Sequence, residues 1–369
     1  MYEIPKKTAL VLGGGGLKGF AHIGVVRALE ERGITPSVYA GTSIGSLIAA
    51  AHISGMSVGE MADRALSLRR RDLFRINHVG MLLERMHSAS LYLEEPLRAL
   101  CESVSPPGTF EGLETPLLVN TVDVAKGTRV VWGLPGLRDV PIVDAVYASC
   151  ALPGFFPPGL VGGRSCIDGG TIDNLPVAIA SLGMDAVIAV DVGTSELARQ
   201  DDIATQGFAT IYMRAATIMM HALQERELAA WNGPPMLLLR PPVSHHHWFS
   251  FANTGELIDA GYAAASRALD QLGDSLTNGV GVYPRRMVQL SVDPEKCIGC
   301  GICVALAPEV MEMGSDGKAH ATMEALEWSP ADGDFVQGCP TEAITVRSLD
   351  GTLETTRPMT ETTLDAADD

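Results

Sequence analysis

The sequence predicts an α/β fold, and three observations indicate this class. Short apolar runs with the length of buried strands alternate with amphipathic helical patterns over residues 8–272. Glycine-containing turns connect the first two of these strands to the helices that follow them. The 369 residues are 46% hydrophobic and include 39 glycines and 22 prolines, which fits a large core with many tight loops.

A glycine-rich loop follows the first predicted strand. The strand is expected at Thr8–Leu12, and the loop Gly13–Gly19 leads into a helix from about Phe20 to Glu31. Because such a loop exposes several backbone N–H groups, it binds an anion. The alternatives are a dinucleotide pyrophosphate, a nucleotide phosphate and an oxyanion that develops during a reaction.

The second strand is followed by a serine at a sharp corner. The segment Gly41–Gly45 reads Gly-Thr-Ser-Ile-Gly, follows the strand-like run Ser37–Ala40 and precedes a helical apolar pattern. Gly41 and Gly45 permit the tight backbone path around Ser43, and the next helix directs its N-terminus at this residue. The sequence therefore predicts a nucleophile elbow.

The position of Ser43 also decides between the three anions. Gly14, Gly16 and Gly19 formally match a dinucleotide fingerprint, which requires an acidic residue at the end of the second strand, where this chain has Ser43. A nucleotide-phosphate loop requires Ser or Thr after its lysine, and Lys18 is followed by glycine. We therefore expect an oxyanion hole at this loop. Its predicted donors are Gly14, Gly15, Gly16 and Lys18.

The middle of the chain supplies a carboxylate. Strands at Leu117–Val122 and Arg129–Trp132 are expected to form a hairpin, and Ser149–Pro158 to form an apolar, proline-rich loop. Asp168 then ends a strand-like run and begins the turn Asp168-Gly169-Gly170. A carboxylate within hydrogen-bond reach of a serine can remove its proton without an imidazole. Asp168 is therefore the predicted base for Ser43.

The remaining elements of the first domain continue the alternation. Val58 to about Leu100 is expected to be helical, and its arginines suit either a solvated helix face or contact with an anionic lipid surface. The later elements are a strand at Ala186–Val192, a helix at Ile211–Trp231, a last strand at Met236–Leu239 and a helix at Gly255–Leu272.

Four sequence blocks together resemble the patatin-like phospholipase family. They are Gly14–Gly19, Gly41–Gly45, Ala148–Pro158 and Asp168–Gly170, and the resemblance covers about residues 7–272. It implies a three-layer α/β/α domain with a mostly parallel sheet. It also implies hydrolysis of lipid acyl esters by a Ser-Asp dyad, with Ser43 as nucleophile and Asp168 as base. The chain departs from the family pattern at Gly13, where Asp or Ser is frequent, and at Lys18, where Arg is commoner.

Histidines leave a second catalytic scheme open. A Ser-Asp-His triad with the chain order of α/β-hydrolases would use His221 or one of His245–His247. The glycine loop ahead of the elbow and the turn at Asp168 favour the dyad. The three consecutive histidines are not expected to bind a metal, because neighbouring side chains alternate in direction. A surface loop or the mouth of the substrate site is expected there.

Four cysteines near the C-terminus have iron–sulfur spacing. Cys297, Cys300 and Cys303 form C-x-x-C-x-x-C, and Cys339 precedes a proline. Zinc ribbons instead use two separated C-x-x-C pairs. Ala307 and the residues upstream of Cys339 stand where a two-cluster ferredoxin has its remaining ligands. One cluster is therefore expected, with four irons because Cys300 fills the middle position.

Residues 287–349 resemble a single-cluster bacterial-type 4Fe-4S ferredoxin, which implies a small α+β domain. Residues 287–369 hold 16 acidic and 4 basic residues, a charge typical of electron carriers that dock on basic partners. The predicted organisation is a hydrolase domain at 1–275, a linker at 276–286, the ferredoxin-type domain at 287–349 and an acidic, disordered tail at 350–369.

Composition limits the classes of binding partner and the cellular compartment that we expect. The formal net charge of −17 argues against nucleic acid. The sequence shows neither a signal-peptide pattern nor an apolar run that spans a bilayer, and its cysteine pattern suits a reducing compartment. We expect a cytoplasmic protein, with peripheral contact to the inner face of the membrane as a further expectation.

The sequence thus predicts a serine hydrolase of lipid or phospholipid esters, of phospholipase A or lysophospholipase type, fused to a 4Fe-4S module. Ester hydrolysis needs no cofactor. The cluster is therefore expected to regulate activity through its redox state, to dock a redox partner protein or to staple the fold. The alternative is a ferredoxin-type electron carrier whose patatin-like domain binds lipid without catalysis.

Overall fold

The computed structural model describes residues 4–193, except 78–89, and residues 207–355, except 247 and 350–352. These residues belong to two compact units. The first contains residues 1–195 and 216–283, and the second contains residues 196–215 and 284–369. Each unit has a hydrophobic core of its own.

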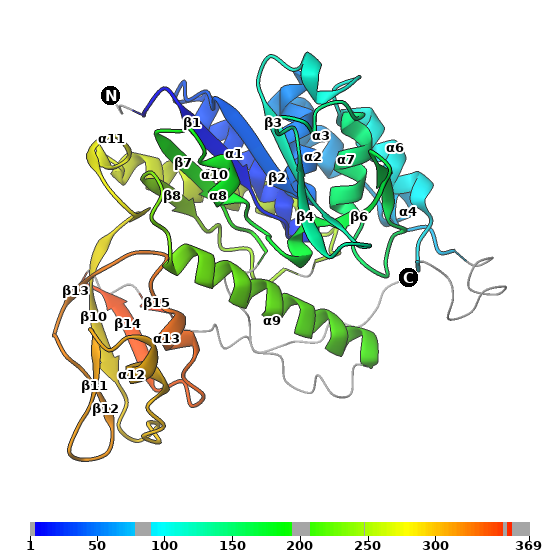
Figure 1. Cartoon of the computed structure of the whole chain (residues 1–369). Coiled ribbons are helices and arrows are strands. Elements are labelled where there is room, and N and C mark those ends of the chain that lie inside the picture. Colours follow the sequence, from blue (N-terminus) through cyan, green and yellow to red (C-terminus); the bar gives the residue numbers. More distant parts are fainter. Residues whose placement is uncertain (1–3, 78–89, 194–206, 247, 350–352, 356–369) are drawn as a thin grey trace. The chain divides into compact units, whose positions relative to one another are not determined.

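One mixed sheet forms the centre of the first unit (Figure 1). In the described residues its order is β5-β6-β3-β2-β1-β7-β8-β9, and β4 pairs with β3 outside this path. The strands from β3 through β9 in this order are parallel, whereas β4, β5 and β6 join antiparallel. The strands are β1 (Thr8–Leu12), β2 (Val38–Thr42), β3 (Leu117–Asp123), β4 (Thr128–Trp132), β5 (Gly159–Val161), β6 (Arg164–Asp168), β7 (Ala186–Val190), β8 (Met236–Leu239) and β9 (Val282–Tyr283).

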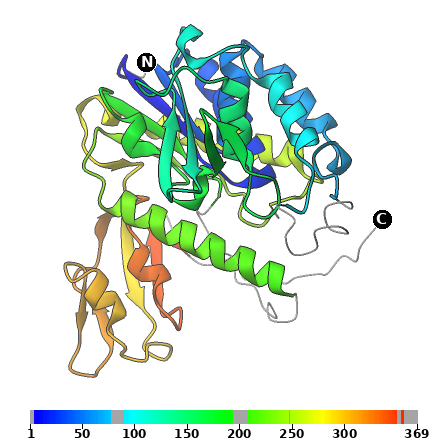
Figure 2. The ribbon, with the colours of Figure 1, turned by 45° about the vertical axis from the view of Figure 1, so that its right-hand side comes forward.

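Most helices of this unit pack against one face of the sheet and a short helix packs against the other, as expected for a three-layer α/β/α domain (Figure 2). On one face the main core packs helices against alternate strand residues such as Leu10, Leu12 and Ile188. The helices on this side are α1 (Ala21–Glu30), α2 (Ile44–Ile53), α3 (Val58–Ser67), α4 (Arg70–Leu73), α6 (Glu94–Val104), α7 (Ile142–Cys150) and α10 (Thr254–Gln271). The short helix α8 (Val177–Ala180) contacts β1, β2 and β7 from the other side.

Most predicted elements of the first unit are present. The strand at Thr8–Leu12 and the hairpin of β3 and β4 are confirmed. The predicted helix after the glycine loop begins as a 3-10 turn, η1 (Gly16–Phe20), and continues as α1. The helix predicted at Ile211–Trp231 is α9 (Phe208–Ala229), whose residues from Ala216 onward belong to the first unit.

Two predictions about the first unit were wrong, and a third was confirmed only in part. Ser149 and Cys150 end α7 and do not belong to a loop, because the first helix-breaking proline comes only at Pro153. Met236–Leu239 is followed by a further strand, β9, whose two residues are too short for a sequence signal. The region from Val58 holds separate helices, and residues 78–89 of it lie outside the described residues.

The residues predicted as a linker, 276–286, include structured elements. Helix α11 (Ser275–Asn278) buries Leu276 in the core of the first unit, and β9 pairs with β8. The first unit therefore extends to Tyr283.

The second unit is a small α+β domain, as expected. In its described residues four antiparallel strands have the order β13-β10-β14-β15, and β11 and β12 form a separate hairpin. Its elements are β10 (Arg286–Val292), α12 (Ile302–Leu306), β11 (Met311–Met313), β12 (Ala319–Ala321), β13 (Leu326–Trp328), α13 (Asp334–Gln337), β14 (Ile344–Ser348) and β15 (Leu353–Thr355). Strand β15 falls within the predicted tail, whose other residues lie outside the described ones.

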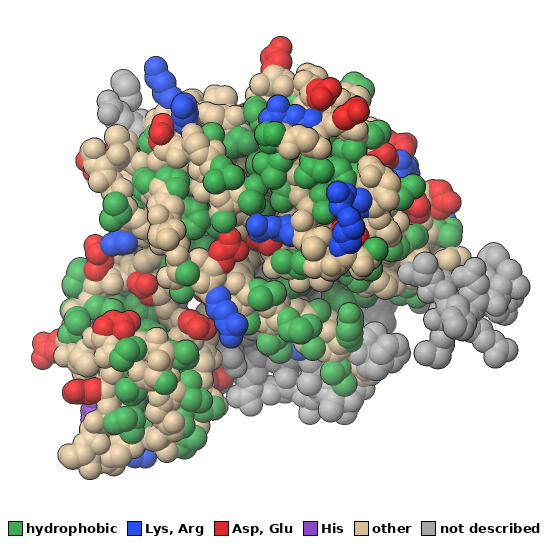
Figure 3. Space-filling view, in the orientation of Figure 1, with side chains coloured by type: hydrophobic (Ala, Val, Ile, Leu, Met, Phe, Trp, Pro, Cys, Tyr) green, Lys and Arg blue, Asp and Glu red, His purple; other side chains and the backbone are tan. Residues whose placement is uncertain are grey.

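Charged side chains of both signs are interspersed with hydrophobic ones on the face shown in Figure 3. Five arginines of the region that begins at Val58 are exposed: Arg64, Arg69, Arg70, Arg71 and Arg75. Helix α9 exposes the large apolar side chains Ile211, Tyr212, Ile218, Met219 and Leu223. Within the described ranges, every helix is too short or too polar to cross a membrane.

Candidate functional site

Ser43 lies at the corner between β2 and α2, in a strained backbone conformation. Its φ of 54° and ψ of −129° are unusual for a residue with a side chain and cost about 1–3 kcal/mol. The corner requires glycine on both sides. A Cβ on Gly45 would lie 2.0 Å from the Leu12 carbonyl oxygen, and a Cβ on Gly41 would lie 2.5 Å from the Ser46 nitrogen. This is the backbone geometry of a nucleophile elbow.

The sheet brings Asp168 to this corner, although 124 residues separate it from Ser43. Strand β3 lies between β2 and β6, with Thr42 paired to Asn120 and Thr121 paired to Asp168. The Ser43 side chain lies close enough to the Asp168 carboxylate to lower the pKa of that carboxyl group. The Gly170 N–H donates to Asp168 Oδ1 at 2.8 Å, so the predicted Asp168-Gly169-Gly170 turn caps its own carboxylate.

Burial controls the proton affinity of Asp168, which is only 5% exposed. Desolvation of the carboxylate raises its pKa from 3.8 to about 6, while the Ser43 side chain and the hydrogen bond from Gly170 oppose the rise. Asp168 is therefore ionised at neutral pH but is a stronger base than an exposed aspartate. Such a carboxylate can accept the proton of the Ser43 hydroxyl.

The glycine loop lies beside the elbow. A Cβ on Gly14 would lie 3.3 Å from the Ser43 Cβ, and the Gly14 N–H donates to the Asn174 carbonyl at 3.2 Å. The described residues offer no hydrogen-bond acceptor to the N–H groups of Gly15 and Gly16. These two donors are therefore available to an anion, whereas the N–H of Gly14 is already engaged.

Lys18 is buried next to the same loop. Its Nζ donates to the Gly193 carbonyl at 3.3 Å and lies 5.6 Å from the centre of the Trp248 ring. Burial lowers its pKa to about 8, and the negative charge of Asp191 partly offsets this effect. The ammonium is thus held by a protein carbonyl, and its role in an oxyanion hole stays a prediction.

Two polar residues that the sequence did not single out contact this site. The Ser149 hydroxyl accepts the Ser43 N–H at 2.8 Å, and the Asn174 Nδ2 donates to the Gly14 carbonyl at 3.1 Å. Both side chains are buried, Ser149 completely. Ser149 lies in an apolar block and Asn174 follows a glycine turn, so no local pattern marks either as functional.

The histidines of the alternative triad are placed differently. In the described residues, the groups that lower the pKa of Asp168 are Ser43 and Gly170, and not a histidine. The rings of His245 and His246 lie 4.0 Å apart, and His246 Nδ1 is 3.4 Å from Asn253 Nδ2. His247 lies outside the described residues.

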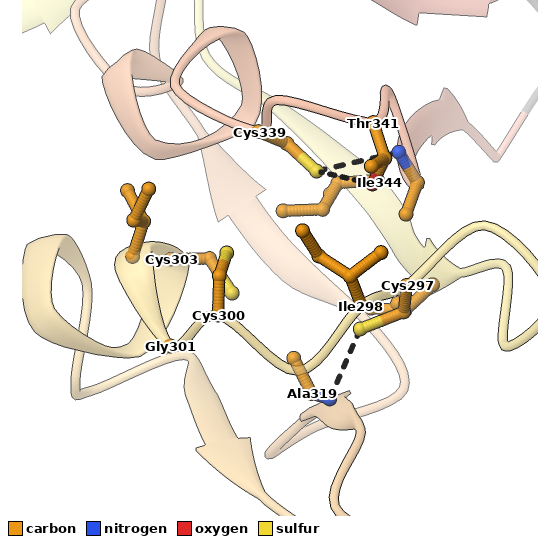
Figure 4. Close-up of a pocket in the computed structure, with 12 residues that line it drawn as sticks. Cys297, Ile298, Cys300, Gly301, Cys303, Ala319, Cys339, Thr341 and Ile344 are labelled. Atoms are coloured by element: carbon orange, nitrogen blue, oxygen red, sulfur yellow. Dashed lines mark hydrogen bonds between the residues drawn. The ribbon is translucent and has the colours of Figure 1, made fainter.

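In the second unit, the four predicted cluster cysteines line one pocket (Figure 4). The loop from Cys297 to Cys303 turns at Gly299 and Gly301, whose φ values of 70° and 74° favour glycine. A Cβ on Gly299 would also lie 2.3 Å from the carbonyl oxygen of Gly317. The loop can therefore wrap around the pocket and present three cysteines to it, while Cys339 approaches from the other side.

The donor set of this pocket fits an iron–sulfur cluster. The Ala319 N–H donates to Cys297 Sγ at 3.5 Å, and the Ala343 N–H donates to Cys339 Sγ at 3.3 Å. Backbone N–H groups of this kind stabilise thiolate ligands. The other lining residues are mainly apolar: Val292, Ile298, Ile302, Ala319, Ala343 and Ile344.

The cysteines of this pocket are not arranged to bind a single metal ion. Among the described residues, no three Cys, His, Asp or Glu side chains are arranged to hold one metal ion. A 4Fe-4S cluster takes four cysteines on separate irons, so its ligands do not need to meet at one point.

Comparison with known proteins adds relatives for the first unit. An uncharacterized NTE family protein of Mycobacterium tuberculosis is 36% identical over 191 residues, which are 52% of this chain and 50% of that protein. Lysophospholipase NTE1 of Coccidioides immitis is 31% identical over 298 residues, which are 72% of this chain and 18% of that protein. The chain thus spans about half the length of the mycobacterial relative and less of the fungal one.

One solved structure is similar to part of the chain. The match to the crystal structure of VipD from Legionella pneumophila covers 72% of this chain and 67% of the VipD chain, with 19% identity and a TM-score of 0.39.

Family models match both parts of the chain. Residues 10–181 match the model of patatin-like phospholipase, and residues 292–346 match that of the 4Fe-4S single cluster domain of ferredoxin I. The chain therefore combines a domain of the patatin-like phospholipase family with a ferredoxin-type 4Fe-4S domain.

Proposed function

We propose that the patatin-like domain hydrolyses carboxylic esters of lipids, with Ser43 as nucleophile and Asp168 as general base. The observation that carries this proposal is the approach of the strained Ser43 to the buried carboxylate of Asp168, whose pKa the Ser43 side chain lowers. The pKa of Asp168, raised to about 6 by burial, lets the carboxylate be ionised yet basic at neutral pH. No histidine is needed in this scheme.

The reaction proceeds through an acyl-enzyme. As Ser43 Oγ attacks the ester carbonyl carbon, its proton moves to Asp168, and the N–H groups of Gly15 and Gly16 stabilise the developing oxyanion. The protonated Asp168 then returns the proton to the leaving alcohol as the ester bond breaks. Asp168 then takes a proton from a water molecule as the water attacks the acyl carbonyl. It gives this proton to Ser43 Oγ as the ester to Ser43 breaks, which releases the fatty acid and restores the free enzyme.

The substrate class rests on the family and on the surface. One relative is named a lysophospholipase, and we propose lipid or phospholipid esters as substrates here, in reactions of phospholipase A or lysophospholipase type. The exposed arginines after Val58 and the exposed apolar side chains of α9 would support peripheral contact with a lipid surface.

For the second unit we propose one 4Fe-4S cluster held by Cys297, Cys300, Cys303 and Cys339. When bound, such a cluster supplies one-electron redox chemistry, which ester hydrolysis does not use. We propose that its state regulates the hydrolase. Ester hydrolysis measured with reduced, oxidised and cluster-free protein tests this role. Equal rates would refute regulation and leave docking of a redox partner or a structural role.

A hydrolysis panel tests the proposed activity. Phospholipids, lysophospholipids and neutral lipid esters are incubated anaerobically with the full chain and with Ser43→Ala. We expect the wild type to release fatty acid from at least one lipid class and Ser43→Ala to release none above background. Binding of lipid vesicles without fatty acid release would instead favour a lipid-binding module in an electron carrier.

A further inference from the structure

We propose that Ser149 is a positioning residue for the nucleophile, an inference that rests on the proposed esterase function. Ser149 lies in the last turn of α7 and is completely buried. Its hydroxyl accepts the Ser43 N–H at 2.8 Å and donates to the Asn120 carbonyl at 2.7 Å. These two hydrogen bonds connect the elbow to the sheet strand beside it.

The elbow needs an acceptor at this point. Ser43 follows the last residue of β2, and its φ of 54° lies outside the strand region, so the strand ends at Thr42 and the Ser43 N–H donates to a side chain instead. Because the Ser149 hydroxyl donates its own proton to Asn120, a lone pair of Oγ faces the Ser43 nitrogen. Asn120 belongs to the central strand β3, which gives this support a rigid base.

The residue that follows α7 also contacts the proposed base. The Asp168 N–H donates to the Ala151 carbonyl at 3.1 Å, two residues after Ser149. The segment Ser149–Ala151 therefore contacts the backbone of both members of the proposed dyad. Ser43 is held by a side chain, whereas Asp168 is held by the main chain. A change of the Ser149 side chain consequently releases the nucleophile and leaves the hydrogen bond to Asp168 in place.

Removing this hydroxyl has a specific expected effect. In Ser149→Ala, the Ser43 N–H loses its acceptor and the Asn120 carbonyl loses a donor. An unsatisfied group of this kind typically corresponds to a fall of about tenfold to about a hundredfold in a rate that depends on its position. We expect this fall in kcat and in the rate of acylation by a fluorophosphonate. KM is expected to stay within about twofold, because Ser149 is buried beneath the elbow.

Ser46 offers a matched control. It is also completely buried, and its hydroxyl donates to the Ser43 carbonyl at 2.7 Å. That carbonyl accepts the N–H groups of Ser46 and Leu47 as well, so Ser46→Ala leaves it hydrogen-bonded. Ser46→Ala therefore removes a hydroxyl from the same corner without leaving a group of Ser43 unsatisfied, and kcat is expected to stay within about threefold of wild type.

The test measures kcat, KM and fluorophosphonate labelling on the full chain, with the thermal midpoint as a check of folding. If Ser149→Ala does not fold, Ser149→Thr and Ser149→Val provide a pair of equal shape that differs only in the hydroxyl. We expect the Thr variant to exceed the Val variant at least tenfold in labelling rate. If the wild type is active and Ser149→Ala has the same kcat, the positioning role of Ser149 is overturned while the esterase proposal stands. Equal labelling rates of Ser149→Thr and Ser149→Val have the same consequence. An inactive wild type whose Ser43 is not labelled overturns the esterase proposal and this inference together.

Discussion

Replacing Asp168 by Asn is expected to stabilise the fold while it removes most of the activity. The folded protein holds a proton on Asp168 more tightly than the unfolded chain does, because burial raises the pKa from 3.8 to about 6. The free energy of unfolding therefore falls as the pH rises from about 4 to about 6, and the loss is complete above that range. At pH 7 the buried charge costs about 3 kcal/mol.

Asparagine has the shape of aspartate without this charge. Its amide oxygen can still accept the Gly170 N–H, which lies 2.8 Å from Asp168 Oδ1. We expect Asp168→Asn to raise the free energy of unfolding at pH 7 by up to about 3 kcal/mol, and to lose this advantage as the pH falls to about 4. Loss of the general base should lower kcat/KM by roughly 10²–10⁴-fold.

The pH dependence of the wild type provides the second half of this test. Below about pH 6 the carboxylate becomes protonated, so kcat/KM should fall tenfold per pH unit, and above this value it should level off. Rates with a water-soluble ester are measured between about pH 5 and pH 8, and stability is measured by urea unfolding. Asp139→Asn, at an exposed aspartate, serves as the control. Wild-type kcat/KM in Asp168→Asn, or a profile that is flat through pH 6, would refute the assignment of Asp168 as base.

Three further predictions concern the glycine loop, Lys18 and the cysteines. Gly14→Ala should lower kcat at least about tenfold, because the new Cβ would lie 2.5 Å from Asn174 Oδ1. The control Gly59→Ala adds a Cβ in open space and should leave kcat unchanged. Equal kcat values in the two variants would contradict this prediction. If the Lys18 ammonium aids catalysis, kcat/KM of the wild type should decline above about pH 8, and Lys18→Met should show no such decline. The same pH profile in both proteins would exclude a catalytic role for the Lys18 ammonium. After reconstitution, Cys297→Ser should lack the visible absorbance of the cluster, while Cys166→Ser in the first unit should keep it. Cluster absorbance in both variants would contradict the proposed ligand set.

The elbow could be predicted from sequence because it depends on local features. An apolar strand, two glycines around a serine and an apolar helix occur within 17 residues, from Ser37 to Ile53. The spacing of Cys297, Cys300 and Cys303 is local in the same way, and it placed all three at one pocket. In both cases chemistry and backbone are specified by neighbouring residues.

Features that depend on distant pairing could not be derived in this way. The contact of Ser43 with Asp168 requires β6 to join β3 antiparallel, a choice that no local pattern in Arg164–Asp168 specifies. The supporting hydroxyl of Ser149 and the burial of Lys18 arise only when α7 and the loop around Trp248 pack against the corner. The sequence motifs and the resemblance to the patatin-like family suggested the dyad, and the sheet brings its two proposed members to the same corner.

The proposed nucleophilic role of Ser43 is tested most directly by locating a covalent adduct. The full chain is treated with a fluorophosphonate and digested, and the labelled peptide is identified by mass spectrometry. We expect one adduct, on Ser43, which is absent in Ser43→Ala and forms more slowly in Asp168→Asn. A wild type that is not labelled would contradict the nucleophilic role of Ser43. So would a Ser43→Ala variant that is labelled at another serine to the same extent as the wild type.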